Sequence, residues 1–250
     1  GAIDLRLPFW FAAGLALLNF LYGVFVLPES LPKERRTATF DWSHANPVGS
    51  MVLLKRYPQV FGLAAVVLIA NLAHYVYPSV FVLFAEYQYR WNEQQVAWVL
   101  AAVGVCSVIV QAGLVGRVVP KFGERRTLLF GLACGVVGFC IYGMADLGWM
   151  FLIGLPISAL WGLAGPATQA LITQQVGADV QGRVQGALMS LVSLAGIVGP
   201  MMFAGTFALF IGKAAPAHLP GAPWLLAALL LAIGWLVGWR FARPPSAAAH

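Results

Sequence analysis

The stretch QVFGLAAVVLIANLAHYVYPSVFVLF at residues 59–84 contains no Asp, Glu, Lys or Arg. About 20 consecutive apolar residues are enough for a helix to cross the hydrocarbon core of a bilayer. No such stretch alternates apolar and polar residues as a barrel strand does, and helices pair their backbone polar groups internally. We therefore predict an all-α integral membrane protein with about seven transmembrane helices. They lie near residues 8–27, 59–84, 95–115, 127–145, 149–172, 184–211 and 223–241.

The composition of the whole chain agrees with this class. Apolar residues make up 60% of the 250 residues and charged residues only 10%, whereas about a quarter of a soluble domain is charged. The net charge of +6 does not indicate a nucleic-acid partner, because the basic residues lie in short connections between apolar stretches. The lipid bilayer is the partner that this composition predicts.

No soluble-type catalytic, phosphate-binding or metal-binding motif is present in the sequence. The three cysteines, Cys106, Cys134 and Cys140, all lie within apolar stretches and are interpreted as small apolar side chains. We therefore expect no enzyme activity, no cofactor and no metal.

The basic residues predict the orientation, because cytoplasmic loops are enriched in Lys and Arg. The connections on the side of the membrane with few basic residues contain only Arg6, Arg90 and Lys213. This bias predicts that Gly1 lies outside and His250 lies in the cytoplasm. Twelve basic residues lie in alternate connections: Lys33, Arg35, Arg36, Lys55, Arg56, Arg117, Lys121, Arg125, Arg126, Arg183, Arg240 and Arg243.

The polar stretch 28–58 separates one helix from a block of six, at 59–241, which a short tail at 242–250 follows. Six helices after a long basic loop are typical of the second half of a transporter built from two similar halves. The chain begins at Gly1 without a methionine and enters a span almost at once. We therefore expect a segment of a longer protein whose N-terminal half is its partner.

Ionisable groups inside a membrane are costly and often functional, so an acidic residue within a span would indicate a functional site. All nine lie at span ends or in loops. A proton-carrying carboxylate is therefore expected in the missing half.

Uncharged polar residues within the spans are the candidates for a substrate cavity. Asn71, His74, Tyr75 and Pro78 share one helical face in the second span. This face indicates either a cavity lining, with a histidine that titrates near neutral pH, or hydrogen bonds between helices. The candidate cavity residues are Asn71, His74, Tyr75, Gln111, Trp161 and Gln169.

Glycine and proline within the spans have two expected roles. Gly131 and Gly135 have the spacing that lets helix backbones approach closely in lipid. Proline interrupts helical hydrogen bonding and can kink a span. The hinge candidates are Pro78, Gly165, Pro166, Gly199 and Pro200.

Several short motifs occur in a characteristic order. Leu27-Pro28-Glu29-Ser30 precedes Glu34-Arg35-Arg36, and the loop from Gly116 ends in Phe122-Gly123-Glu124-Arg125-Arg126. Gln181-Gly182-Arg183-Val184-Gln185-Gly186 and Ile197-Val198-Gly199-Pro200 follow. Together, over nearly the whole chain, these motifs resemble the tetracycline/proton antiporters of the major facilitator superfamily.

The resemblance implies a twelve-helix fold of which this chain holds helices six to twelve. Residues 1–27 would end the N-terminal half, 28–58 would form the central cytoplasmic loop, and 59–241 would form the C-terminal bundle. It implies a bacterial inner-membrane antiporter that uses protons to expel tetracycline or a related drug-like molecule by alternating access. The implied gating loop contains Gly116, Arg117, Gly123, Glu124, Arg125 and Arg126.

Three positions depart from the pattern of that family. Pro120 replaces the Asp of the basic loop motif, Gly135 replaces an acidic residue of the ninth helix, and Ser107 replaces a histidine often found in the eighth. These departures leave open a different or broader substrate. An importer or metabolite exporter on the same fold, or a truncated remnant that does not transport, also remains an alternative.

Overall fold

The computed structural model describes residues 6–27, 57–177, 180–212 and 218–242. All regular structure in these segments is helical, which confirms the predicted fold class. Most of the predicted central loop and of the predicted tail lies outside the described residues. The chain divides into two units, Gly1–Trp42 and Ser43–His250. The first contains one described helix, α1 (Leu7–Phe25), most of whose apolar side chains are exposed.

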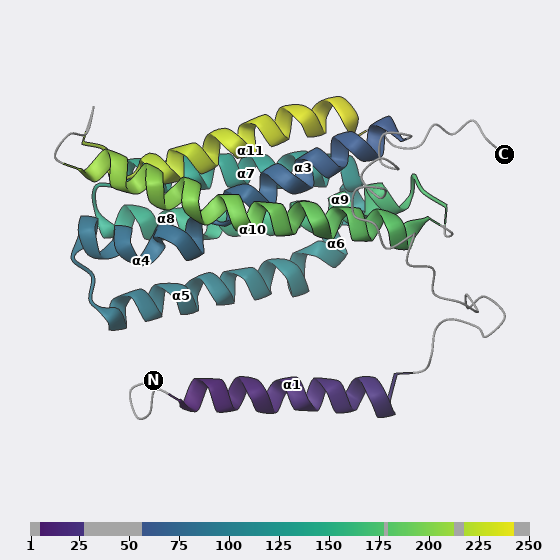
Figure 1. The fold of residues 1–250 in the computed structure, drawn as a ribbon, viewed down its shortest axis with the longest axis horizontal. Helices are drawn as coiled ribbons and strands as arrows, with labels where there is room; N and C mark the ends of the chain where they lie inside the picture. The colour runs from purple at the N-terminus through teal and green to yellow at the C-terminus, as the bar shows by residue number, and fades with distance from the viewer. Residues whose placement is uncertain (1–5, 28–56, 178–179, 213–217, 243–250) are drawn as a thin grey trace. The chain divides into compact units, whose positions relative to one another are not determined.

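The second unit contains six continuous helical segments that are long and apolar enough to cross a membrane. Figure 1 shows them running side by side. Three of the six are built from more than one helix. The elements are α3 (Pro58–His74), α4 (Val76–Tyr89), α5 (Glu93–Val108), the π-helix η3 (Ile109–Leu114), α6 (Val115–Phe122), α7 (Glu124–Met144), α8 (Gly148–Ala159), the 3-10 helix η4 (Leu160–Leu163), α9 (Ala164–Thr173), α10 (Gln181–Ile211) and α11 (Ala222–Phe241).

Local sequence accounts for several helix boundaries. Proline stands in the first turn of α3 and α11, where its missing N–H removes no helical hydrogen bond. The Asn92 side chain accepts a hydrogen bond from the Gln95 backbone N–H, and the Gln95 side chain accepts one from the Asn92 backbone N–H. This pair of bonds starts α5. Gly123 has a φ of 79° and separates α6 from α7, a backbone conformation that favours glycine.

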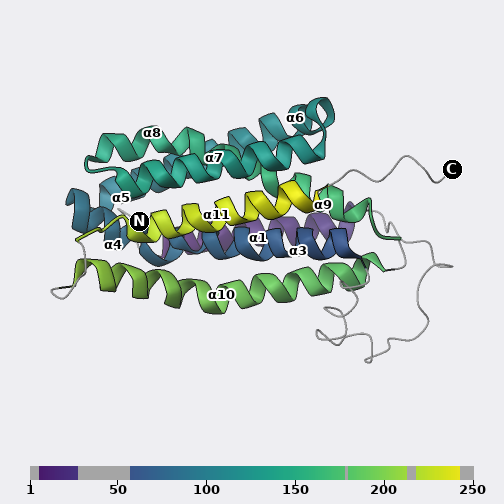
Figure 2. The same cartoon turned by 90° about the horizontal axis from the view of Figure 1, so that it is seen from above.

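Within this unit α11 packs against α7 and α3, α3 packs against α10, and α7 packs against α8 and α9. Figure 2 shows α11 beside α3 and α10 from a second direction. Glycines on α7 allow close approach: a Cβ on Gly131 would lie 2.9 Å from the Ala164 backbone nitrogen, and one on Gly138 would lie 2.6 Å from the Cβ of Ser158. The α7 glycines therefore let α8 and α9 pack closely against α7.

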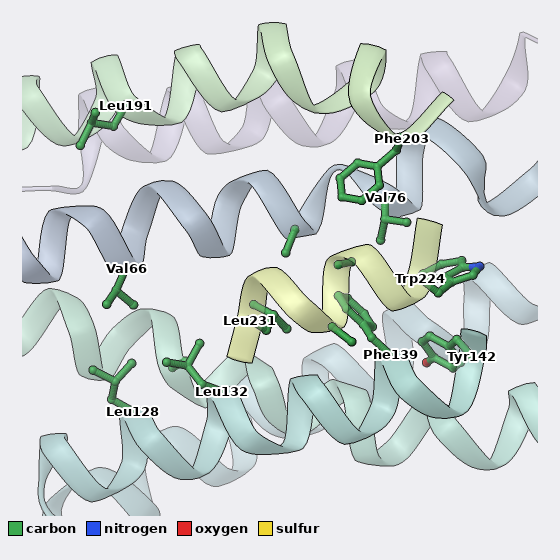
Figure 3. Close-up of a cluster of buried hydrophobic side chains, with 14 of the residues drawn as sticks. Val66, Val76, Leu128, Leu132, Phe139, Tyr142, Leu191, Phe203, Trp224 and Leu231 are labelled. Atoms are coloured by element: carbon green, nitrogen blue, oxygen red, sulfur yellow. The ribbon is translucent and has the colours of Figure 1, made fainter. Parts of the chain in front are cut away.

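The core at one end of the bundle is aromatic. Trp224 of α11 is fully buried, and its ring lies 5.1 Å from Tyr142 and 5.8 Å from Phe139, both on α7. Tyr142 stacks on Phe151 of α8, with ring centroids 4.0 Å apart. Figure 3 shows Trp224, Tyr142 and Phe139 close together, and a row of aliphatic side chains that includes Leu128 and Leu132 further along α7. These rings fix the relative positions of α7, α8 and α11 beside the candidate site.

Candidate substrate cavity

A cavity of about 680 Å³ lies among the helices of the second unit. Its walls come from α3, α4, α5, η3, α7, α8, η4, α9 and α10. This volume lies within the range of small-molecule binding sites. The polar and aromatic side chains in its lining are Asn71, His74, Tyr77, Ser107, Gln111, Ser158, Trp161, Thr168 and Gln169.

Five of the six candidate cavity residues come together in this lining: Asn71, His74, Gln111, Trp161 and Gln169. Tyr75 does not line it. The helix is interrupted at Tyr75, whose hydroxyl oxygen would lie 2.8 Å from a Cβ on Gly196 of α10. The Tyr75 ring is therefore packed against α10.

Pro78 explains this interruption. Proline has no N–H to donate, and its ring crowds the carbonyl of the residue four positions earlier, which is His74. α3 ends at His74 and α4 begins at Val76. The 3.6-residue periodicity that groups Tyr75 with Asn71 does not continue through this break.

Trp161 forms the aromatic side of the cavity. Its ring lies 5.7 Å from the His74 ring and 5.5 Å from Phe139. Gly135 provides the space for it, because a Cβ there would lie 3.0 Å from Cγ of Trp161 and 2.7 Å from Cδ1 of Leu231. The Trp161 ring and Leu231 thus occupy the space that a side chain at position 135 would need.

A chain of hydroxyl groups lies beside the aromatic core. The Tyr77 hydroxyl donates to the Tyr142 hydroxyl at 3.1 Å, and the Tyr142 hydroxyl lies 2.5 Å from Oγ of Ser158. Ser158 also donates to the carbonyl of Leu155 at 3.0 Å. These hydrogen bonds between hydroxyl groups link α4, α7 and α8. Sequence reasoning missed Tyr77 and Ser158 as cavity residues, and it missed Tyr77 because that residue follows the break in the helix.

Several lining side chains already use their donors within the protein. Asn71 donates to the Val67 carbonyl at 2.8 Å, and Thr168 donates to the Ala164 carbonyl at 2.7 Å. By contrast, the side chains of His74, Gln111 and Gln169 have no hydrogen bond within the part of the chain that the structure describes. These three side chains are available to bind a ligand.

Gln111 lies in the π-helix, in the middle of a span that is otherwise α-helical. π-helical turns are rare and are frequently found at functional sites. The sequence contains no clear signal for this turn. It sets the direction in which Gln111 leaves the helix.

The cavity carries no formal charge apart from any proton on His74. Among the described residues, its lining contains no Asp, Glu, Lys or Arg. Such a surface suits uncharged polar atoms and flat rings. Nor does any group of three or more His, Cys, Asp or Glu in the described segments have a geometry that could hold a metal ion.

The predicted gating loop connects three helices at one end of the bundle. Glu124 accepts a hydrogen bond from the Gln174 side chain at 2.9 Å, just after α9. Arg125 donates to the Trp239 carbonyl in the last turn of α11 at 3.1 Å. Arg117 donates to the Gly113 carbonyl at 2.8 Å within its own span. Gly116 faces open space, and Arg126 is exposed on α7.

The other hinge candidates differ in their surroundings. Gly165 and Pro166 lie in the first turn of α9, which follows the 3-10 turn η4, and Pro166 leaves the Gly162 carbonyl without its helical donor. α10 instead runs without interruption through Gly199 and Pro200. Gly199 is a position of close approach, because a Cβ on it would lie 2.6 Å from the Cβ of Tyr75.

Comparison with known proteins shows which family the chain resembles. The chain is 33% identical to the class C tetracycline resistance protein of Escherichia coli, over 92% of this chain and 56% of the relative. It is 28% identical to the class H tetracycline resistance protein of Pasteurella multocida, over 93% of this chain and 57% of the relative. The chain thus spans about half the length of the curated relatives it matches, and these matches confirm the resemblance inferred from the motifs.

A solved structure has the same fold. The human organic anion transporter MFSD10 (TETRAN) superposes with a TM-score of 0.78 at 19% identity, over 94% of this chain and 57% of that chain. The family model described as Major Facilitator Superfamily matches residues 1–200. The chain therefore belongs to the Major Facilitator Superfamily.

Proposed function

We propose that the chain is the second half, with the last helix of the first half, of a proton-coupled antiporter that expels tetracycline or a related drug-like molecule by alternating access. Its similarity to the class C and class H tetracycline resistance proteins over about half of their length supports this assignment. Residues 1–27 end the first half and 28–58 form the central cytoplasmic loop. Residues 59–241 form the second bundle and 242–250 the cytoplasmic tail.

The cavity is the observation that carries the proposal. It is large enough for a small molecule, and His74, Gln111 and Gln169 have hydrogen-bonding capacity left for one. Trp161 adds a flat apolar surface for ring stacking. A ring-containing molecule with several uncharged oxygen or nitrogen atoms suits this lining best.

The protons are taken up by acidic groups of the N-terminal half. The absence of carboxylates from the described lining residues supports the assignment of proton uptake to the N-terminal half and of drug binding to this cavity. The protein then acts as a transporter and not as an enzyme, with the small molecule and protons as its substrates.

The protein lies in the bacterial inner membrane as a multi-pass protein with a cytoplasmic C-terminus. The distribution of described basic residues in the six-helix unit supports this orientation. Arg90 follows the end of α4, at the opposite end of the bundle from the gating loop. Arg117, Lys121, Arg125, Arg126, Arg183 and Arg240 lie toward the gating-loop end.

The test is tetracycline accumulation in efflux-deficient bacteria that express the full-length gene, with and without a protonophore. We expect lower accumulation than in cells without the gene, and we expect the protonophore to abolish the difference. Trp161→Ala should raise accumulation, whereas Trp149→Ala should not, because Trp149 is 59% exposed on α8 and does not line the cavity.

Unchanged accumulation, with the protein detected in the membrane, rejects tetracycline as the substrate. Other ring-containing drugs and then metabolites would be tested in both directions, which separates an exporter from an importer. A protein that moves none of them and binds no solute is a remnant that does not transport.

A further inference from the structure

A second hollow, of about 340 Å³, lies between α6 and α7, and we call it the α6–α7 groove. Its walls are Val118 and Phe122 of α6 and Arg126, Thr127 and Phe130 of α7. Phe122 and Phe130 are 51% and 52% exposed. The Thr127 hydroxyl donates to the Gly123 carbonyl at 2.8 Å, so it offers no free donor. The surface of the groove is thus apolar, and Arg126 contributes only the aliphatic part of its side chain to it.

The α6–α7 groove is separate from the candidate substrate cavity. Leu128 and Leu132 are the side chains of α7 nearest Arg126 and Phe130 that line the cavity. Two residues along a helix correspond to a turn of about 200°, so Arg126 and Phe130 point away from that side. A molecule in the groove therefore contacts the outer face of α7 and leaves the cavity free.

Arg126 forms part of the groove wall, and Lys121 lies beside that wall on the Phe122 ring; neither has an anionic partner within the described part of the chain. Arg126 is exposed and has no hydrogen bond or ion pair within the described part of the chain. Nζ of Lys121 lies 5.5 Å from the centre of the Phe122 ring. The neighbouring acid, Glu124, is directed to Gln174.

Two other arginines of the gating loop differ from Arg126, because their side chains already have hydrogen-bond partners. Arg125 is held by the Trp239 carbonyl and Arg117 by the Gly113 carbonyl. Neither of them lines the groove. Arg126 is thus the arginine of the loop that remains free to bind an external anion beside an apolar surface.

The depth of these residues in a bilayer fits a lipid. The α7 span begins at Glu124, so Arg126 lies within its first turn. The ends of a membrane-spanning helix lie near the lipid headgroups. Phe130 lies four residues further along, about 6 Å deeper into the hydrocarbon at 1.5 Å per residue. A cation above an apolar groove at the basic end of a membrane helix is the arrangement that binds an acidic headgroup and an acyl chain.

We propose that the α6–α7 groove binds one anionic phospholipid, with its phosphate between Arg126 and Lys121 and an acyl chain along Phe122 and Phe130. The charge of the two cations favours an acidic lipid over a zwitterionic one. The exposed phenylalanines favour a lipid over a soluble phosphate, because only a lipid covers them with hydrocarbon.

The test is native mass spectrometry of the purified full-length protein, delipidated in detergent and titrated with phosphatidylglycerol or with phosphatidylcholine of identical acyl chains. We expect one tightly held phosphatidylglycerol and no such binding of phosphatidylcholine. Arg126→Gln should weaken this binding by about fivefold, and the double variant with Lys121→Gln should weaken it further. Arg240→Gln removes an exposed charge at the same end of the bundle and should leave the binding unchanged.

A second variant tests the groove without altering its charge. Val118→Phe fills the groove and should displace the lipid, with thermal unfolding measured on every variant to exclude misfolding. Glycerol 3-phosphate, a headgroup without acyl chains, should not compete.

Each contrary result overturns the proposal. Equal losses in Arg126→Gln and Arg240→Gln mean that diffuse surface charge holds the lipid. Competition by glycerol 3-phosphate at the same concentration as the lipid means a site for soluble anions. Equal retention of the two lipids means that the cations do not select the headgroup, and unchanged binding in Val118→Phe means that the lipid binds elsewhere on the protein.

Discussion

The side chain of Tyr75, at the break between α3 and α4, lies against Gly199 of α10, where an added Cβ would be 2.6 Å from the Cβ of Tyr75. The interrupted span and the long unbroken helix α10 therefore touch through a tyrosine and a residue without a side chain. Any side chain at position 199 forces the two helices apart at this point.

We expect Gly199→Ala to lower the free energy of unfolding by about 1–3 kcal/mol, because overpacking forces backbone or side-chain shifts. Thermal unfolding of the purified protein in detergent measures this loss. Gly205→Ala is the matched control on the same helix, since a Cβ there meets no atom within 4 Å. Equal melting temperatures for the two variants would show that the contact with Tyr75 is not tight.

Tyr142→Phe should destabilise the bundle by removing the centre of the hydroxyl chain. Its hydroxyl joins Tyr77 of α4 to Ser158 of α8, and both partners would lose a hydrogen bond in an apolar setting. We expect a loss of roughly 0.5–2 kcal/mol, as for hydrogen bonds between membrane helices. The measurement is again the melting temperature in detergent.

Tyr87→Phe is the control for that change. The Tyr87 hydroxyl lies 3.3 Å from Nε2 of His218 at an exposed position, where water can replace the lost partner. A Tyr87→Phe variant as unstable as Tyr142→Phe would mean that burial of the hydroxyl chain contributes nothing.

Gly135→Ala should weaken drug binding through Trp161. The added Cβ would lie 3.0 Å from Cγ of Trp161 and would push the ring from its position beside His74. We expect a loss of about tenfold in affinity, which corresponds to roughly 1.4 kcal/mol. Equilibrium binding of the transported drug to the purified protein measures it.

Gly104→Ala provides the comparison, because a Cβ on Gly104 of α5 meets nothing within 4 Å. Full affinity in both variants would remove Trp161 from the proposed binding surface. A loss confined to Gly135→Ala would also explain physically why an acidic side chain does not fit at this position.

His74→Gln should leave transport coupled to protons. A glutamine keeps a hydrogen-bonding group in the cavity but removes the ring that lies 5.7 Å from Trp161. We expect affinity to fall by about two- to tenfold, the range for loss of an aromatic pair, while the protonophore still abolishes export. Transport that continues without a proton gradient in this variant would identify His74 as the proton carrier.

His218→Gln supplies the matched control for that experiment. His218 lies outside the cavity, in the connection between α10 and α11, and contacts Tyr87. It should change neither the affinity nor the protonophore sensitivity. A change of sensitivity in both variants would point to a general effect of losing a histidine.

Hydropathy predicted the number and approximate position of the spans, because crossing a bilayer requires length and apolar character that the sequence displays directly. It predicted the helix ends less well. The second span was expected at 59–84 and extends to Tyr89, and the third was expected at 95–115 and covers Glu93–Phe122. Helices continue past the hydrocarbon into polar residues. Hydropathy therefore locates the part of a helix that lies in the hydrocarbon, but not the residue at which its backbone hydrogen bonds end.

The cavity shows a second limit of sequence reasoning. Asn71 and His74 reach the lining as a regular helix predicts, but Tyr75 does not, because the helix is interrupted there. Pro78 marks that interruption in the sequence. Periodicity must therefore be restarted at Val76, ahead of the proline, and Tyr77, which lines the cavity, lies in the restarted helix.

The π-turn at Ile109–Leu114 bears on how this span can change in length during evolution. A π-turn accommodates one residue more than an α-turn, so deletion of one residue there restores an α-helix and leaves both flanking segments in phase. The same deletion elsewhere in the span rotates every later side chain by about 100°. Single-residue gaps among relatives of this chain should therefore concentrate at 109–114, and they should be accompanied by loss of the amide that Gln111 presents to the cavity.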